Sequence, residues 1–131
     1  MRRRAKFGAG VVLIACMTAV ALLGATASSA QQAAKAKPAK VSVNDFYFGP
    51  SSVSIKKGGS VKWTWSSFNT YPHDVHLKSG PKGLKQKASY STKTTAVTEA
   101  EFKKTFPTPG TYKFICTIHP TEMKLTVVVK K

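Results

Sequence analysis

Four side chains of this sequence have the types and the spacing of a metal site. The run Cys116-Thr-Ile-His-Pro-Thr-Glu-Met123 brings a thiol, an imidazole and a thioether close together, and a second imidazole lies upstream in Tyr-Pro-His-Asp-Val. One thiolate, two imidazoles and a weakly bound thioether are the ligands of trigonal copper sites that transfer electrons. The predicted ligands of one copper ion are therefore His73, Cys116, His119 and Met123.

Each of these residues also has an ordinary structural interpretation. A single cysteine in a β-sandwich is most often a small core residue, and a methionine near a terminus usually serves packing. The spacing of Cys116 and His119 on one loop, combined with a Pro-His pair ahead of another strand, favours the metal site over three coincidences. The third histidine, His76, lies an odd number of steps from His73, so a regular strand would put it on the opposite face, at the surface.

The segments that must position these ligands alternate between apolar and polar residues, as strands do. The expected strands are residues 41–48, 53–55, 61–65, 73–77, 99–106, 111–116 and 124–130. Residues 82–98 are rich in Lys, Ser and Thr, and we expect a long surface excursion there with one short edge strand or one turn of helix. Six to eight short strands without a helix predict an all-β Greek-key β-sandwich.

Alternation also predicts which side chains point into the core. Trp63 and Trp65 share one face of their strand and are expected to be buried there, with a smaller chance that one of them packs beside the copper. Lys104 falls on the same face as Phe102 and Phe106, which makes that face harder to assign.

The sequence divides into three parts. Residues 1–30 have a basic start, an apolar stretch and a small-residue ending, which is the order of a secretory signal peptide. Residues 31–40 are rich in Ala, Gln and Lys and are interpreted as a flexible linker, and residues 41–131 as one small domain. We expect cleavage after Ala30, with cleavage after Ala27 as a second position.

Two other fates of the N-terminus remain open. The apolar stretch approaches the length of a membrane span, so it could stay as an anchor. Cys16 follows a small residue, as in lipoprotein signals, but the apolar run continues past it. The expected location is periplasmic or extracellular, with membrane attachment as the alternative.

The charge of the chain is strongly positive. Four of the 21 basic residues lie in residues 1–6, so the remaining 17 lysines and the 5 acids give the mature chain a charge of +12. Such a surface attracts acidic proteins or an anionic membrane or wall surface. Nucleic acid is excluded as a partner, because the lysines are scattered and no recognition motif is present.

The ligand segments resemble a known family. Tyr71-Pro-His-Asp-Val-His-Leu77 and Gly110-Thr-Tyr-Lys-Phe-Ile-Cys-Thr-Ile-His-Pro120 are similar to the two halves of the copper site in small cupredoxins of the plastocyanin and amicyanin type. The run from Asp45 to Trp63 is similar to their first strands, and the resemblance covers roughly residues 41–130. It implies a β-sandwich with one type 1 (blue) copper near one end, which carries single electrons between protein partners.

The sequence departs from that family at two positions. Met123 is four residues after His119, a spacing between those of the amicyanin and plastocyanin types. Asp74 stands where the family commonly has Asn, which hydrogen-bonds to the cysteine loop. We expect Asp74 to keep this acceptor role with Thr117 as donor, and to lower the reduction potential by its negative charge.

Three classes of function follow from the ligand set. We expect a monomeric electron carrier that exposes His119 beside Pro120 and docks an acidic redox partner transiently through surrounding lysines. An exported copper carrier or buffer would use the same ligands and is the alternative. An enzyme is not expected, because multicopper oxidases and copper nitrite reductases need further copper centres and this sequence has three histidines.

Overall fold

The structure, a computed structural model, describes residues 36–131, and its regular elements are strands apart from one 3₁₀ turn. The elements are β1 (Ala39–Asn44), β2 (Tyr47–Gly49), β3 (Ser52–Lys56), β4 (Ser60–Trp65), β5 (His76–Ser79), the 3₁₀ turn η1 (Lys87–Tyr90), β6 (Glu101–Thr105), β7 (Gly110–Ile115) and β8 (Lys124–Lys130). The predicted signal peptide and most of the predicted linker lie outside the described residues. Within residues 36–131, no helix has the length and apolar character needed to cross a membrane.

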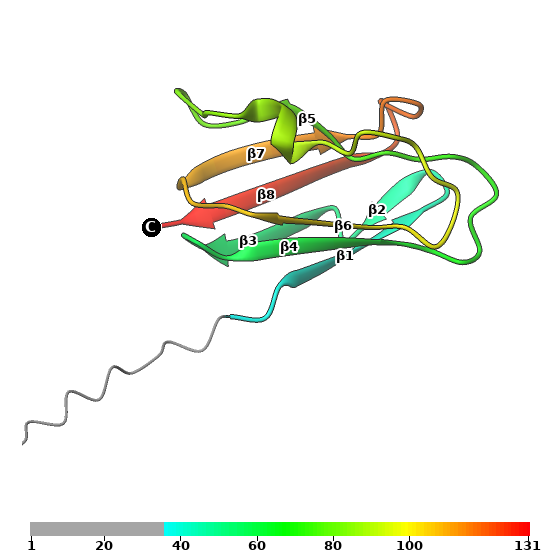
Figure 1. The fold of residues 1–131 in the computed structure, drawn as a ribbon, viewed down its shortest axis with the longest axis horizontal. Helices are drawn as coiled ribbons and strands as arrows, with labels where there is room; N and C mark the ends of the chain where they lie inside the picture. Colours follow the sequence, from blue (N-terminus) through cyan, green and yellow to red (C-terminus); the bar gives the residue numbers. More distant parts are fainter. Residues whose placement is uncertain (1–35) are drawn as a thin grey trace, which may run out of the picture. The chain divides into compact units, whose positions relative to one another are not determined.

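The strands form two mixed sheets that pack face to face (Figure 1). One sheet has the order β2-β1-β4-β6 and the other the order β3-β8-β7-β5. Each sheet contains one parallel pair: β1 pairs with β4 in the first sheet, and β3 pairs with β8 in the second. The predicted all-β sandwich is therefore confirmed. β1 begins at Ala39, which pairs with Val61, so this residue of the predicted linker belongs to the first strand.

The inward faces follow the predicted alternation. Trp63 and Trp65 are buried in the core between the sheets, as expected. In β6, Phe102 and Lys104 are half-buried on the inward side, while the alternate residues Glu101, Lys103 and Thr105 are exposed. The ammonium Nζ of Lys104 lies over the ring of Tyr90, 4.2 Å from the ring centroid, and donates to the Ser89 hydroxyl at 2.6 Å, so a cation–π contact accommodates this lysine on the inward face.

One expected strand is in fact two. The segment predicted as a single strand over residues 41–48 turns at Asp45 and Phe46 and forms the antiparallel hairpin of β1 and β2. Asp is a common turn residue, and Phe46 has the left-handed φ of 67° that a tight reversal requires. The alternation continues through the turn, which is why periodicity alone could not detect it.

The strand predicted for residues 73–77 starts later than expected. β5 begins at His76, and His73 forms only an isolated antiparallel bridge with Ala96. The bridge is possible because residues 82–98 return along this part of the chain. That excursion contains one 3₁₀ turn, as allowed for, and it is fixed by the buried side chains of Leu84 and Tyr90.

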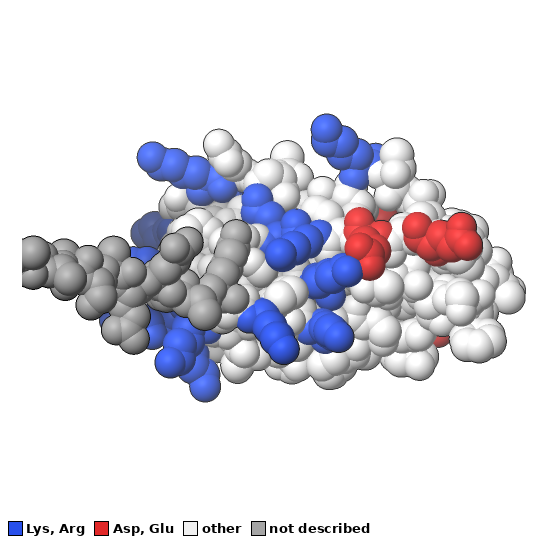
Figure 2. All heavy atoms as spheres, turned by 60° about the horizontal axis from the view of Figure 1, so that its bottom comes forward, with Lys and Arg blue, Asp and Glu red and all other residues white. Residues whose placement is uncertain are grey.

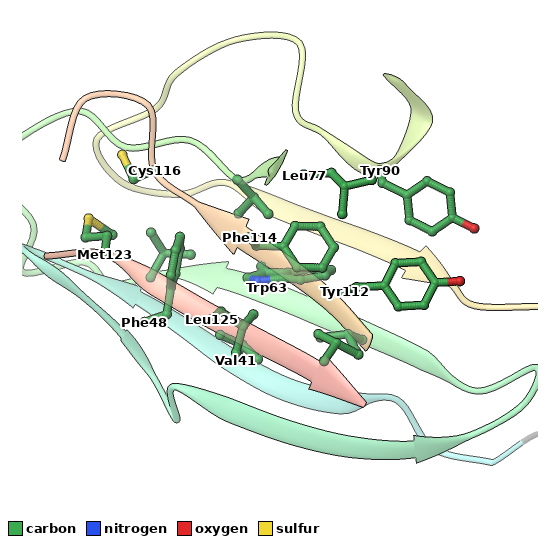
Figure 3. Close-up of a cluster of buried hydrophobic side chains, with 14 of the residues drawn as sticks. Val41, Phe48, Trp63, Leu77, Tyr90, Tyr112, Phe114, Cys116, Met123 and Leu125 are labelled. Carbon is green, nitrogen blue, oxygen red and sulfur yellow. The ribbon is translucent and has the colours of Figure 1, made fainter. Parts of the chain in front are cut away.

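The predicted ligands gather at one end of the sandwich, which we call the ligand end. It is the end at which β1, β4 and β7 finish and β5, β6 and β8 begin, as the strand registers require. Cys116 and Met123 lie together at this end of the buried cluster, and the sulfur atoms of both mark its limit (Figure 3). The core therefore fixes one side of the site directly.

Candidate metal centre

Three of the four predicted ligands are brought together by two loops at the ligand end. The donor atoms of His73, Cys116 and His119 all lie within 4.8 Å of one another. Cys116 Sγ is 3.9 Å from Nδ1 of His73 and 3.9 Å from Nδ1 of His119. With bonds of about 2.0 to 2.3 Å to nitrogen and sulfur, a trigonal site has N–S edges of about 3.8 Å, so the triangle has the size of a metal site.

The types of the donor atoms fit copper. The group of three offers two imidazole nitrogens and one sulfur, and it includes no carboxylate oxygen. Magnesium and calcium prefer oxygen ligands, whereas imidazole and thiolate suit copper. Cys116 is free of any disulfide in the described part of the chain, so its sulfur is available to a metal.

The loop between β7 and β8 is closed by its own backbone. The amide of Cys116 donates to the carbonyl of Met123 at 3.2 Å, and the amide of Met123 donates to the carbonyl of His119 at 2.9 Å. Met123 is fully buried, and Figure 3 shows it beside Cys116 at the end of the core. The loop thus keeps this fourth predicted ligand buried next to Cys116.

His73 is held on every side. Its amide and carbonyl are both bonded to Ala96, at 2.9 and 3.0 Å, and its carbonyl also accepts a bond from Nε1 of Trp65 at 3.3 Å. Nε2 of the ring lies 2.8 Å from Oδ1 of Asp45. If Nε2 donates its proton to this carboxylate, the lone pair on Nδ1 faces Cys116, which is the tautomer that a metal needs.

Asp45 is the residue of the site that sequence reasoning missed. Its carboxylate accepts hydrogen bonds from the amide and hydroxyl of Thr70, at 2.9 and 2.8 Å, and from the amide of Tyr71 at 3.3 Å. The bond to His73, followed by those from Thr70 and Tyr71, holds the pKa of the Asp45 carboxyl well below its usual range. The only signal in the sequence was an acid at the end of an alternating segment, and nothing linked it to His73.

Asp74 links the two ligand segments. Its Oδ1 accepts a hydrogen bond from the amide of Thr117 at 2.6 Å, and its Oδ2 accepts one from the Thr117 hydroxyl. The predicted acceptor role with Thr117 as donor is confirmed. The amide of Asp74 also points at Cys116 Sγ, 3.5 Å away, and hydrogen bonding to this sulfur is one of the means by which a protein tunes a copper potential.

His119 is the half-exposed member of the group, and apolar side chains surround it. The ring of Phe46 meets the His119 ring edge-on at 5.1 Å between centroids, and the ring of Tyr71 does so at 6.3 Å. Phe46, Tyr71 and Ile118 are all among the exposed large hydrophobic residues of the described chain. We call these three residues the apolar rim.

The third histidine and the two tryptophans lie at different places in the fold. His76 is exposed in β5 and does not belong to the group of facing donors, as predicted. Trp63 lies in the middle of the core, while Trp65 reaches the site indirectly through its bond to the His73 carbonyl. Trp65, and not Trp63, is therefore the tryptophan with a hydrogen bond to one of the predicted ligand residues.

Comparison with known proteins gives the same family from sequence and from structure. Residues 35–130 match the copper-binding proteins of the plastocyanin/azurin family. Amicyanin-alpha of Methylorubrum extorquens is 38% identical over 125 residues, covering 89% of this chain and 92% of the relative.

Two solved structures illustrate the likeness in fold. A mutant plastocyanin of a fern superposes with a TM-score of 0.59 and 32% identity, over 70% of this chain and 100% of that chain. A copper-containing nitrite reductase from Thermus scotoductus gives a TM-score of 0.59 with 24% identity, over 75% of this chain. The match spans only 23% of that enzyme's chain, so it concerns the fold of one part of the enzyme.

Proposed function

The chain belongs to the plastocyanin/azurin family of copper-binding proteins, and from this membership we propose the role of each residue at its ligand end. The protein is a type 1 copper protein that carries single electrons, and copper is its cofactor. His73, Cys116 and His119 would hold the copper ion, and Met123 would be its fourth, more weakly bound ligand. The observation that carries this assignment is that one donor atom from each of the three residues lies within 4.8 Å of the others, with Cys116 Sγ 3.9 Å from Nδ1 of both histidines.

The protein's part in electron transfer is to keep the ligands still. Copper, when bound, supplies a one-electron change between Cu(II) and Cu(I). His73 is fixed by Ala96 and Asp45, and Cys116 by the backbone bond to Met123, so the ligands come from elements that the sandwich already holds in place. Little needs to rearrange when the charge changes. His119 reaches the surface and is the proposed route for the electron.

The partner docks over His119. The rim of Phe46, Tyr71 and Ile118 supports an apolar contact, which suits the small and short-lived interfaces of electron transfer. Lys124, next to Met123, is the lysine nearest to the ligand loop in the sequence and offers an acidic partner a positive charge there, while most of the charge of +12 lies on other parts of the domain. We propose that the protein acts as a monomer and that its partner is an acidic redox protein.

The protein has no catalytic step of its own in this proposal. A nitrite reductase or an oxidase needs further copper centres. The sequence has three histidines, of which His73 and His119 belong to the proposed site and His76 is exposed in β5. The likeness to nitrite reductase extends to a fold that many cupredoxins share.

The protein is exported in this proposal. Residues 1–30 act as a cleaved signal peptide, residues 31–40 form the start of the mature chain, and the domain works in the periplasm or outside the cell.

Cyclic voltammetry of the copper-loaded protein separates electron transfer from copper delivery. An electron carrier gives a stable, reversible one-electron wave and keeps its copper in the presence of a moderate chelator. A copper carrier would instead release the metal rapidly to an acceptor.

Met123→Leu tests the axial ligand, because it keeps the volume but removes the sulfur, and a changed potential with the blue colour retained supports the assignment. An unchanged potential would contradict it.

A further inference from the structure

The acidic residues of the mature chain all lie at the ligand end. One acid follows β1, and one each precedes β5, β6 and β8. The fifth is the first residue of β6, and all of these strand ends meet at the ligand end. The five acids are Asp45, Asp74, Glu99, Glu101 and Glu122. Two of them are hydrogen-bonded inside the site: Asp45 contacts His73, and Asp74 accepts from Thr117. The opposite end of the sandwich therefore carries no acid among the described residues.

That opposite end is covered with lysines. They occupy the start of β1, the end of β3 and its loop, the loop after β5, and the end of β8, and all are exposed. We call this surface the lysine pole, and its members are Lys40, Lys56, Lys57, Lys82, Lys130 and Lys131. Lys56 pairs with Lys130 across the sheet, and the amide of Lys57 donates to the carbonyl of Lys130 at 2.8 Å, so several of these charges are close neighbours. Figure 2 shows lysines over one side of the face in view and acids toward the other.

We propose that the lysine pole is a docking surface for an anionic phospholipid membrane, and that binding there leaves the ligand end facing away from the lipid. Lysines near an anionic bilayer add their attractions over a broad surface, without needing a shaped pocket. The pole fits this requirement, because its charges come from several strand ends and loops. The inference goes beyond the proposed function, since it assigns a role to the surface that electron transfer does not use.

Distance from the copper site argues against a redox partner at the pole. β8 starts directly after Met123, and its seven residues span roughly 23 Å before Lys130. A redox protein bound at the lysine pole would sit at the wrong end for exchange through His119.

Vesicle sedimentation tests the proposal. The copper-loaded chain of residues 31–131, which includes the whole compact unit Ala34–Lys131, is mixed with phosphatidylcholine vesicles with or without about one third phosphatidylglycerol, at about 0.15 M salt. The pole variant combines Lys40→Gln, Lys56→Gln, Lys57→Gln and Lys130→Gln. The matched control removes the same charge from exposed lysines elsewhere, by Lys78→Gln, Lys87→Gln, Lys93→Gln and Lys113→Gln.

The expected result is binding to the anionic vesicles alone, weakened about tenfold or more in the pole variant and by less than about threefold in the matched control. Equal weakening in both variants would overturn the proposal, because net charge alone would explain it. Binding to soluble polyglutamate but not to vesicles would also overturn it, in favour of an acidic protein. The visible spectrum of each sample reports the copper site separately, so a failure of the ligand assignment and a failure of the lysine pole are distinguishable.

Discussion

Asp45 and His73 are joined across the ligand end by a contact of 2.8 Å between Oδ1 and Nε2. The contact exists because the chain turns sharply after β1 and so carries Asp45 to the loop that precedes His73. It orients the imidazole so that Nδ1 faces Cys116 and is left for the metal. Asp45, which is not a predicted ligand, thus sets the orientation in which His73 meets the metal.

Removing the Asp45 carboxylate is expected to weaken copper binding. Asp45→Ala leaves the His73 ring without its partner, and loss of such an outer contact typically costs about 10- to 100-fold in metal affinity. Asp45→Asn keeps an acceptor oxygen and is expected to lose less. Competition with a chelator of known affinity measures both variants. An Asp45→Ala protein that binds Cu(II) as tightly as the wild type would contradict the role of this contact.

The difference between what the sequence predicted and what it missed has a physical basis. His73, Cys116 and His119 could be found because their types are rare and their spacing relates them to strand ends. Asp45 could not, because its contact depends on a turn at Phe46 that keeps the alternation of its strand intact.

Surface arrangement was equally hidden from sequence reasoning. The total charge was evident, but the separation of acids from lysines depends on which strand ends meet. The apolar rim likewise combines Phe46, Tyr71 and Ile118, which lie on three different loops.

Asp74→Asn is expected to raise the reduction potential. The substitution removes a negative charge close to Cys116 and keeps an oxygen for the Thr117 amide, so it changes the electrostatics more than the geometry. A charge at this range shifts the potential by on the order of tens of millivolts. Voltammetry of both proteins at the same pH and salt measures the shift. Identical potentials would contradict the claim that the Asp74 charge lowers the reduction potential.

The apolar rim can be tested without knowing the partner. In the proposed route, electron self-exchange between Cu(II) and Cu(I) forms occurs when two copies meet through their exposed His119 edges. Ile118→Lys places a charge in that contact and is expected to slow the exchange by about tenfold or more, as measured by NMR line broadening. Ser54→Lys adds the same charge on the exposed face of β3 and serves as the control. Equal rates in the two variants would show that the rim is not the contact surface.

Tyr112 predicts how stability depends on alkaline pH. Burial, with the neighbouring Tyr90, raises the pKa of Tyr112 to about 12, and its hydroxyl donates to the Thr108 carbonyl at 2.7 Å. Because the folded pKa lies above the ordinary value of 10.0, this contribution to stability is complete below pH 10 and is lost as the pH rises toward 12.

Tyr112→Phe should therefore be less stable than the wild type by about 1 kcal/mol at neutral pH, through the lost hydrogen bond. The deficit should shrink above pH 10, because the variant has no hydroxyl to ionise. Denaturant unfolding at several pH values follows this difference. A deficit that stays constant up to pH 12 would contradict the interpretation.

The visible spectrum of residues 31–131 during titration with Cu(II) tests the central claim most directly. Cys116→Ser removes the thiolate, and His76→Ala removes the histidine that lies outside the site. We predict an intense blue thiolate-to-copper band in the wild type, which saturates at one copper per chain, persists in His76→Ala and is absent from Cys116→Ser. A wild-type protein that binds copper without that band, or a Cys116→Ser protein that keeps it, would contradict the type 1 site built from His73, Cys116, His119 and Met123.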